Sequence, residues 1–431
     1  MSALRAPGYE ETAIRDRARR GAAAVFPEPE NYGRAVLGAA GTAAGRDRLD
    51  ALRIVPPVFV PHRLEKLFEL GEEPLPDDVD LAGQVGGFDS PLPLYVSAFG
   101  STQVASSTLG EDLSRQAGRL GIPMVIGENV VPVNGYGRTG EHGPGSLLAR
   151  ISGYVEESGT AGGVVVQQST QDADAEVWNL VYSDPAALPL LESDRLAFEL
   201  KVGQGAKPGL GGLTLVDRRK AGSLTDRFQI ADSFGPDSDT VVRCATPGTF
   251  TAEILTQQIR LMRNNYPRCR VWVKLPPGRD IAHAARVALA AGADAVTVDG
   301  AEGGTGWAPT VFLDQVGLPL GEVLARVRRD GPVGRGLLAS GRIWEGSRAV
   351  KCLALGAEAV GLGRAALLAV DEDPREGLIR LVEALRFEMQ LLISALGKYR
   401  TSELSADDLW CQATPLEEER RDFPAGESCP R

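Results

Sequence analysis

The sequence lacks the features that membrane spans, metal centres and disulfide frameworks require. It has no run of about 18 or more uninterrupted apolar residues, so we expect no membrane-spanning helix. Its five cysteines are dispersed without a Cys-x-x-Cys pair, and it has only three histidines, which argues against a disulfide framework, a zinc site or an iron–sulfur site. Acidic residues outnumber basic ones by 57 to 46, and the formal net charge of −11 argues against a nucleic-acid partner.

The first thirty residues also lack an apolar stretch of the kind that secretory signals contain. We therefore expect a cytoplasmic protein. A chain of 431 residues with 43% hydrophobic residues can form two or three average domains or one large barrel with extensions.

The middle of the chain alternates short apolar runs with longer segments of helical period. Continuous apolar runs bounded by glycine and followed by helices are typical of buried parallel strands. Eight such units over about 270 residues predict an α/β fold, a (β/α)8 TIM barrel. The eight candidate strands lie in PLYVSAFG, PMVIGEN, GGVVVQQS, LAFELKVG, RVWVKL, DAVTVDG, GRGLLASG and EAVGLG.

An internal repeat supports the barrel. ALAAGADAV at 288–296 and CLALGAEAV at 352–360 share the pattern of a helix, a glycine and a strand, 64 residues apart. A doubly wound open sheet is the alternative, but its first strand would be followed by a Gly-x-Gly-x-x-Gly turn that residues 95–102 lack.

The boundaries of the apolar pattern divide the chain into three parts. We expect an N-terminal arm with an irregular lead-in over residues 1–92, the barrel over 93–370, and a C-terminal helix with a charged tail over 371–431. The barrel has a long insertion at 204–269, after the fourth strand. Long loops are usually functional, and this one begins at the end of the barrel where such enzymes keep their active sites.

Two lysines are expected inside the barrel. In RVWVKL, Lys274 shares an inward face with Trp272, and Lys201 ends the fourth strand in the same way. A buried lysine needs a carboxylate or a ligand as its partner, so either a ligand or a structural acid such as Asp299 could pair with it. Glu128, after the second strand, is either an acid at the barrel mouth or a solvent-exposed loop residue.

Glycines at the ends of the last strands indicate a phosphate site. Barrels commonly bind phosphate near strands seven and eight, where backbone amides can approach the anion. The seventh strand ends in Gly341-Arg342 and the eighth in Gly363-Arg364, while DGAEGGTG at 299–306 follows the sixth. Their alternative role is to permit tight turns between strands and helices.

These motifs, in this order, resemble the FMN-binding synthase domain of the glutamate synthase family. The resemblance runs from about Leu64 to Leu409 and rests on QGAKPG at 204–209 with its preceding lysine, GGTG after an Asp-Gly strand end, Gly-Glu on the second strand, VKL, and FDSPLPLYVSAFGS at the entry to the first strand.

The resemblance implies a site for FMN. Glu128, Lys201, Lys207 and Lys274 would be the catalytic residues. The residues that it places around the cofactor are Ser97, Ala98, Ser101, Gln204, Lys274, Gly303, Gly304, Thr305, Gly341, Arg342, Gly363 and Arg364.

The reaction that the resemblance implies is reductive amination in glutamate or other amino-acid biosynthesis. Ammonia or an amine adds to a 2-oxo acid, such as 2-oxoglutarate or a relative of it, and reduced flavin delivers hydride to the imine carbon. Positively charged residues would hold the carboxylates of the oxo acid.

The chain departs from the family at several points. The cysteines of the family's 3Fe–4S cluster are missing from LLAVDEDPREG after the last strand, so no 3Fe–4S cluster is expected, and the family's N-terminal amidotransferase domain is missing. A separate glutaminase and an electron-donor protein are therefore possible partners, and the chain could form a homo-oligomer. Leu210, Thr249 and Gln167-Gln168 stand where the family has other residues, which leaves the substrate open.

Three other functions remain open. The chain could be a subunit of an N-alkylglutamate-type synthase complex or a non-catalytic FMN-binding subunit. Oxidation of a 2-hydroxy acid is the third, but it uses an active-site histidine, and neither His142 nor His283 lies at an expected strand end.

Overall fold

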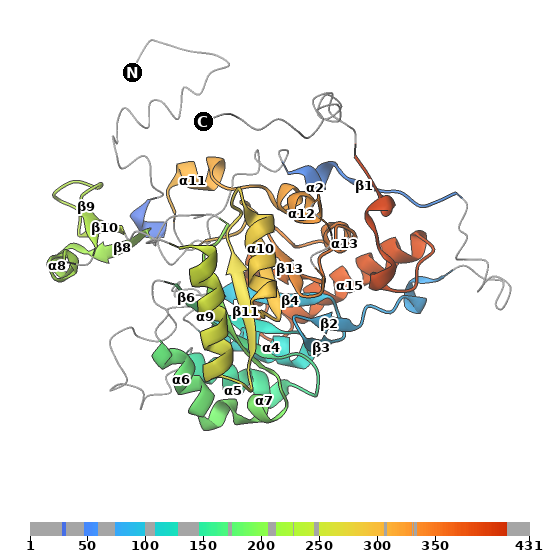
Figure 1. Ribbon diagram of the computed structural model, residues 1–431, viewed down its shortest axis with the longest axis horizontal. Helices are drawn as coiled ribbons and strands as arrows, with labels where there is room; N and C mark the ends of the chain where they lie inside the picture. Colours follow the sequence, from blue (N-terminus) through green and yellow to red (C-terminus); the bar gives the residue numbers. More distant parts are fainter. Residues whose placement is uncertain are drawn as a thin grey trace, which may run out of the picture.

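Eight parallel strands close into a barrel, as the sequence predicts (Figure 1). The computed structural model describes residues 28–31, 47–58, 74–99, 108–127, 146–170, 175–205, 213–226, 228–244, 250–305, 308–329, 331 and 334–411. In order around the barrel the strands are β4 (Leu94–Phe99), β5 (Met124–Ile126), β6 (Val164–Ser169), β7 (Leu196–Lys201), β11 (Arg270–Leu275), β12 (Ala295–Asp299), β13 (Leu337–Ser340) and β14 (Ala359–Leu362). Each strand lies within one of the eight predicted apolar runs.

The strands are apolar on both faces because both faces are buried. Outward residues such as Val166 and Phe198 pack under the helices, while inward residues such as Val165 and Ala197 fill the barrel. The surrounding helices are α4 (Leu109–Leu120), α5 (Leu147–Glu157), α6 (Ala175–Ser183), α7 (Leu188–Glu192), α9 (Ala252–Asn265), α10 (Ile281–Ala290), α11 (Thr310–Gln315), α12 (Leu320–Arg329), α13 (Gly346–Ala354), α14 (Arg364–Glu372) and α15 (Gly377–Ala395).

The internal repeat of the sequence corresponds to two equivalent turns from helix to strand. Gly292 lies between α10 and β12 with φ of 104°, and Gly356 lies between α13 and β14 with φ of 101°. Only glycine adopts this backbone conformation without strain, so it ends the helix and directs the chain into the strand.

A hairpin of β2 (Gly83–Val85) and β3 (Phe88–Ser90) packs against the apolar end of the barrel interior. Trp272 is fully buried there, and its indole nitrogen donates a hydrogen bond to the carbonyl of Gly86 at 3.0 Å. Since this end carries the amino-terminal halves of the strands, polar chemistry is left to the opposite end.

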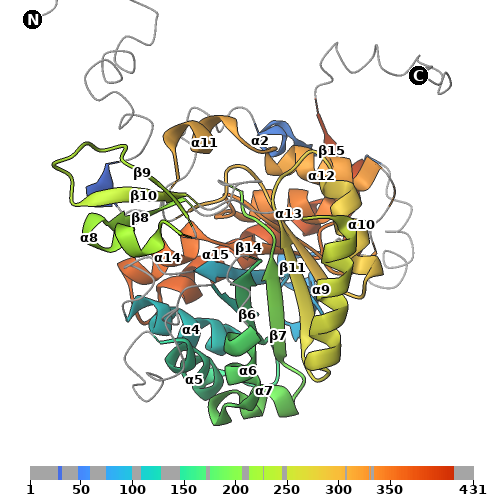
Figure 2. The ribbon, with the colours of Figure 1, turned by 60° about the vertical axis from the view of Figure 1, so that its left-hand side comes forward.

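The insertion between β7 and β11 consists of two different parts. Strands β8 (Leu213–Asp217), β10 (Thr240–Cys244) and β9 (Gln229–Ala231) form a small antiparallel sheet, which lies to one side of the barrel with the short helix α8 (Arg218–Ala221) (Figure 2). The second part, α9, packs against β11 as a regular barrel helix. The added structure is therefore shorter than the predicted insertion of 204–269.

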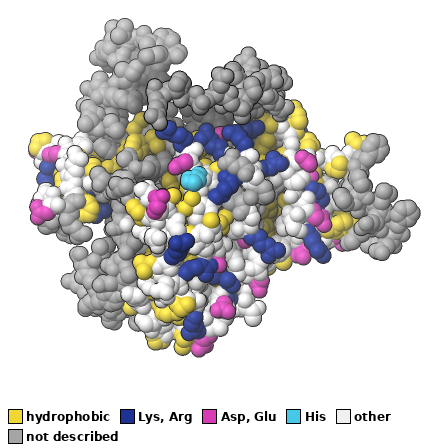
Figure 3. Space-filling view, viewed as in Figure 1, with side chains coloured by type: hydrophobic (Ala, Val, Ile, Leu, Met, Phe, Trp, Pro, Cys, Tyr) yellow, Lys and Arg dark blue, Asp and Glu magenta, His cyan; other side chains and the backbone are white. Residues whose placement is uncertain are grey.

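Segments from the two ends of the described chain meet beside the barrel. Strand β1 (Arg53–Ile54) pairs antiparallel with β15 (Leu409–Trp410), and the short helix α2 (Arg48–Ala51) precedes β1. None of the helices in the described ranges is long and apolar enough to cross a membrane. On the face of Figure 3, Lys and Arg side chains are interspersed with Asp and Glu.

Candidate functional site

A layer of polar side chains lies inside the barrel, above the apolar layer that contains Trp272. The inward positions of neighbouring strands carry Gln167 on β6, Glu199 on β7 and Thr297 on β12, all buried. The Gln167 amide donates a hydrogen bond to one oxygen of Glu199, and the Thr297 hydroxyl donates to the other at 3.1 Å. Burial raises the pKa of the Glu199 carboxyl, while the positive charge of Lys274 lowers it.

Lys274 extends inward from β11, as its alternation with Trp272 predicts, and it meets an acid. Its ammonium lies 3.2 Å from Asp299 at the end of β12, and only 8% of the residue is exposed. Asp299 also accepts hydrogen bonds from the Ser340 hydroxyl and from the Gly205 amide at 3.1 Å. The pairing with Asp299, which the sequence left open beside a ligand contact, is thus present.

Lys201 lies next to Lys274 in the sheet, because the two residues are register partners on β7 and β11. The chain that follows Lys201 is held against the loop after β12. Gln204 donates a side-chain hydrogen bond to Thr305 at 2.8 Å. A Cβ atom added at Gly205 would lie 2.0 Å from the carbonyl oxygen of Gly300, so the two backbone segments are in close contact. The start of QGAKPG and the GGTG motif, about a hundred residues apart, therefore form one surface beside the lysines.

On the other side of the barrel mouth, small residues leave room beside unsatisfied polar groups. The hydroxyl of Ser97 on β4 is buried and makes no hydrogen bond within the described part of the chain, and Ala98 follows it. A Cβ on Gly361 would lie 2.2 Å from this hydroxyl, so glycine is required there. At Gly363 the opposite holds, since no atom lies within 4 Å of a Cβ built on it.

The two predicted Gly-Arg steps lie at neighbouring strand ends. Gly363 caps the N-terminus of α14, and the guanidinium of Arg364 donates a hydrogen bond to the carbonyl of Glu302 at 2.7 Å. A Cβ on Gly304 would touch the Arg364 side chain, so this arginine covers the GGTG turn. Burial lowers the pKa of Arg364, and the charge of Arg342 lowers it further. Two nearby positive charges that repel each other favour an anion between them.

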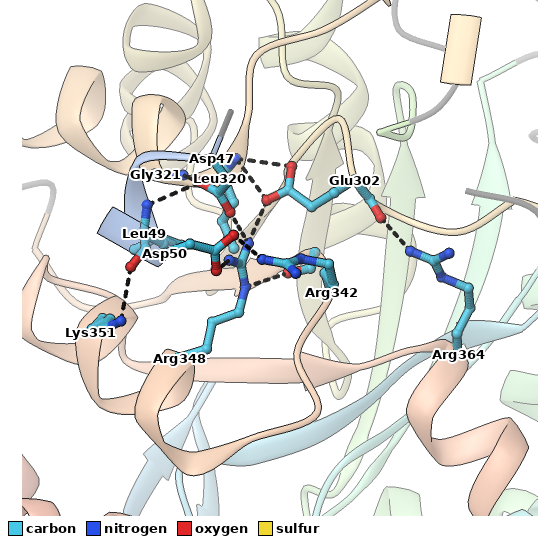
Figure 4. Close-up of polar contacts among 11 residues, drawn as sticks. Asp47, Leu49, Asp50, Glu302, Leu320, Gly321, Arg342, Arg348, Lys351 and Arg364 are labelled. Atoms are coloured by element: carbon cyan, nitrogen blue, oxygen red, sulfur yellow. Dashed lines mark hydrogen bonds and ion pairs between the residues drawn. The ribbon is translucent and has the colours of Figure 1, made fainter. Parts of the chain in front are cut away.

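Gly341 and Arg342 adopt left-handed backbone conformations, with φ of 146° and 53°. A non-glycine residue in this region is strained and is often held there for a function. The guanidinium of Arg342 pairs with Asp50 of α2 (Figure 4). Of the other predicted site residues, Gly303 lies beside Gly300, while Glu128, Ser101 and Lys207 lie outside the described residues.

A buried group of charges below the GGTG turn was not predicted from the sequence (Figure 4). Arg348 of α13, which is 1% exposed, forms ion pairs with Asp47, Asp50 and Glu302. Its Nε also donates to the carbonyl of Gly341 at 3.1 Å. We call Asp47, Glu302 and Arg348 the buried triad. It joins the N-terminal segment to the loops after β12 and β13, and its only sequence signal is the glutamate within DGAEGGTG.

The two carboxyl groups of the triad shift each other's pKa. Burial and the adjacent Asp47 together raise the pKa of Glu302 to about 7, against the effect of Arg348. Arg348 and the hydrogen bond with Glu302 instead lower the pKa of Asp47. The negative charge of Asp47 therefore favours the protonated form of Glu302.

This raised pKa should make stability depend on pH. Because folded Glu302 binds a proton that the unfolded chain releases at a pKa near 4.5, the free energy of unfolding should decrease as pH rises from about 4.5 to about 7. The total contribution is at most about 3 kcal/mol. We expect Glu302→Gln, which keeps the hydrogen bonds but cannot ionise, to show a smaller decrease in denaturant titrations across this range. Glu322→Gln, on the surface of α12, is the control, and equal slopes for both variants would contradict the assignment.

The fold and the site define a (β/α)8 barrel that carries Lys201, Lys274 and Arg364 at the carboxyl ends of its strands or directly after them. Solved structures share this fold. An oxidised active mutant of (S)-mandelate dehydrogenase matches with a TM-score of 0.54 at 20% identity, covering 93% of this chain and 99% of that one. The flavin-binding domain of baker's yeast flavocytochrome b2 matches with a TM-score of 0.55 at 18% identity, covering 95% and 91%.

Sequence comparison finds relatives that are named as glutamate synthases. Residues 190–372 match the conserved region in glutamate synthase. The archaeal-type glutamate synthase (NADPH) of Dehalococcoides mccartyi is 35% identical over 187 residues, which is 42% of this chain and 36% of that protein. A glutamate synthase large subunit-like protein of Rhizobium meliloti is 36% identical over 191 residues, or 41% of this chain and 40% of that protein.

Residues 190–372 therefore match the conserved region in glutamate synthase, in agreement with the resemblance seen in the sequence. The relatives are named as enzymes, in agreement with the prediction that this chain is an enzyme. The matched part of the chain spans only about a third of the length of the archaeal-type relatives.

Proposed function

We propose that the barrel binds FMN and catalyses the reductive amination of a 2-oxo acid. The observation that carries this proposal is the pair Lys201 and Lys274, which are neighbours on β7 and β11 at the end of the barrel where such enzymes bind substrates. Two ammonium groups in a largely buried setting suit a dianionic oxo acid such as 2-oxoglutarate.

Several features support a flavin in this pocket. The open space at Gly363, the N-terminus of α14 and the charges of Arg342 and Arg364 would hold the phosphate. The unsatisfied hydroxyl of Ser97 and the small residue Ala98 would face the ring system. When bound, FMN supplies the hydride that reduces the imine.

The protein's own groups would position the reactants. Asp299 orients the Lys274 ammonium, and the Ser340 hydroxyl and Gly205 amide fix Asp299 in turn. Gln204, held by Thr305, would line the same pocket. The nitrogen source and the electron donor would be supplied by separate partners.

Oxidation of a 2-hydroxy acid is less well supported, although the similar structures include mandelate dehydrogenase. A structural likeness at 20% sequence identity shows a shared fold and not a shared reaction. His283, the one histidine in the described residues, lies on α10 in the outer layer and not at a strand end.

The test is an absorbance spectrum of the purified protein followed by anaerobic photoreduction. We expect flavin bands near ~370 and ~450 nm, and reoxidation only when 2-oxoglutarate and ammonium are both present. Bound flavin without reoxidation would redirect the search to another oxo acid, an amine in place of ammonia, or a non-catalytic role. A protein that cannot be reconstituted with FMN would refute the proposal.

A further inference from the structure

Arg150 on α5 is a fully buried arginine without a counter-ion among the described residues. It is 0% exposed, and none of its three guanidinium nitrogens makes a hydrogen bond within the described part of the chain. Burial lowers its pKa to about 10, and no acid of the described ranges opposes the effect. Arg348 is almost equally buried, at 1% exposure. Unlike Arg150, it has three carboxylate partners.

An unpaired buried guanidinium costs several kcal/mol, since its charge is removed from water without compensation. The position of Arg150 adds to the cost, because it lies in the first turn of α5, near the positive end of the helix dipole. Two acids of the helix pair α4 and α5, Glu111 and Glu156, both pair with Arg115. A bound anion would remove each of these costs.

We expect the Arg150 side chain to point toward the end of the barrel that holds the carboxyl ends of the strands. Leu147, Arg150, Ile151 and Tyr154 recur at helical spacing and form the buried face of α5. Long side chains on a helix point toward its N-terminus, which here follows the loop after β5. The Ser146 hydroxyl accepts from the amide of Ala149, which satisfies only one of the first amides of the helix.

We propose that Arg150 and the N-terminal turn of α5 form a binding site for an oxyanion, either a carboxylate or a phosphate group. This site differs from the proposed phosphate site at Gly363. Around the barrel, β4 separates β14 from β5, and α4 lies between α14 and α5. The inference does not depend on the proposed function.

The experiment compares wild type with Arg150→Met and with Arg260→Met as a control from the exposed surface of α9. Thermal unfolding is followed in chloride buffer and with added inorganic phosphate or glutarate at constant ionic strength. We expect a saturable rise in the unfolding temperature of wild type and of Arg260→Met with at least one oxyanion. In Arg150→Met this rise should be absent, and affinity measured by calorimetry should fall at least tenfold.

The change in unfolding temperature that Arg150→Met causes in chloride buffer separates ligand binding from a structural role. Without an oxyanion, Arg150→Met should be as stable as wild type or more so, because it removes an uncompensated charge. If it lowers the unfolding temperature equally in every buffer, or if no oxyanion stabilises wild type, the proposal is wrong. Arg150→Lys, which keeps the charge, serves if the methionine variant does not fold and should retain part of the effect.

Two further arms identify the anion and its place. A response to phosphate alone supports a phosphate group, and a response to glutarate supports a carboxylate. Lys274→Met should keep the response, whereas its loss there would place the anion in the barrel centre and contradict the proposal. Because no measurement requires bound FMN, a failure of the flavin experiment leaves this result interpretable.

Discussion

Replacing Arg348 with methionine should lower the free energy of unfolding by about 3 to 5 kcal/mol. Arg348 is 1% exposed and is the cation that compensates Asp47 and Glu302. Removal of its charge would leave a buried carboxylate without a partner and would also remove the hydrogen bond to Gly341. Chemical denaturation at neutral pH measures the loss.

Arg326→Met is the matched control. This arginine pairs only with Glu322 among the acids of the described chain, and its side chain is 32% exposed. Such pairs contribute less than about 1 kcal/mol. A triple variant with Arg348→Met, Asp47→Asn and Glu302→Gln should recover stability, since no buried charge remains. Equal effects of Arg348→Met and Arg326→Met would show that the buried triad does not hold the N-terminal segment on the barrel.

Replacing Lys274 with methionine should reduce turnover in the proposed reaction by about 10² or more, since removal of one preorganised charge from a buried site has effects of this size. Lys274 is the charge nearest Asp299 and also acts on Glu199. Loss of the ammonium would leave both acids uncompensated beside the substrate. Steady-state rates with a chemical reductant, the FMN content and the unfolding temperature should be measured together.

Lys351→Met is the control for this variant, because Lys351 donates to the Leu49 carbonyl outside the barrel interior. We expect it to retain turnover within about threefold of wild type. If Lys274→Met keeps full flavin content and wild-type turnover, Lys274 has only a structural role. If flavin is lost together with stability, Asp299→Asn in the same chain restores charge balance and tests turnover again.

The strands could be predicted because buried parallel strands leave a strong local pattern. All eight apolar runs form barrel strands, and the repeated glycines at 292 and 356 end their helices as expected. The inward direction of Lys274 follows from a period of two residues, which any strand obeys. The length of the added insertion could not be predicted. The sequence alone does not show that α9 packs on β11 as a barrel helix and is not part of the insertion.

The amino-acid sequence by itself determined the barrel, its family motifs and the lysines that face its interior, since each depends on local period or on residues close in the chain. Only the tertiary structure decided which charges meet. Asp299 faces Lys274 because adjacent strands place them in contact, and Asp47 meets Glu302 and Arg348 across some three hundred residues. Arg150 has no such partner in the part of the chain that the structure describes. Spacing cannot reveal this, because burial and the lack of a counter-charge depend on every element packed around it.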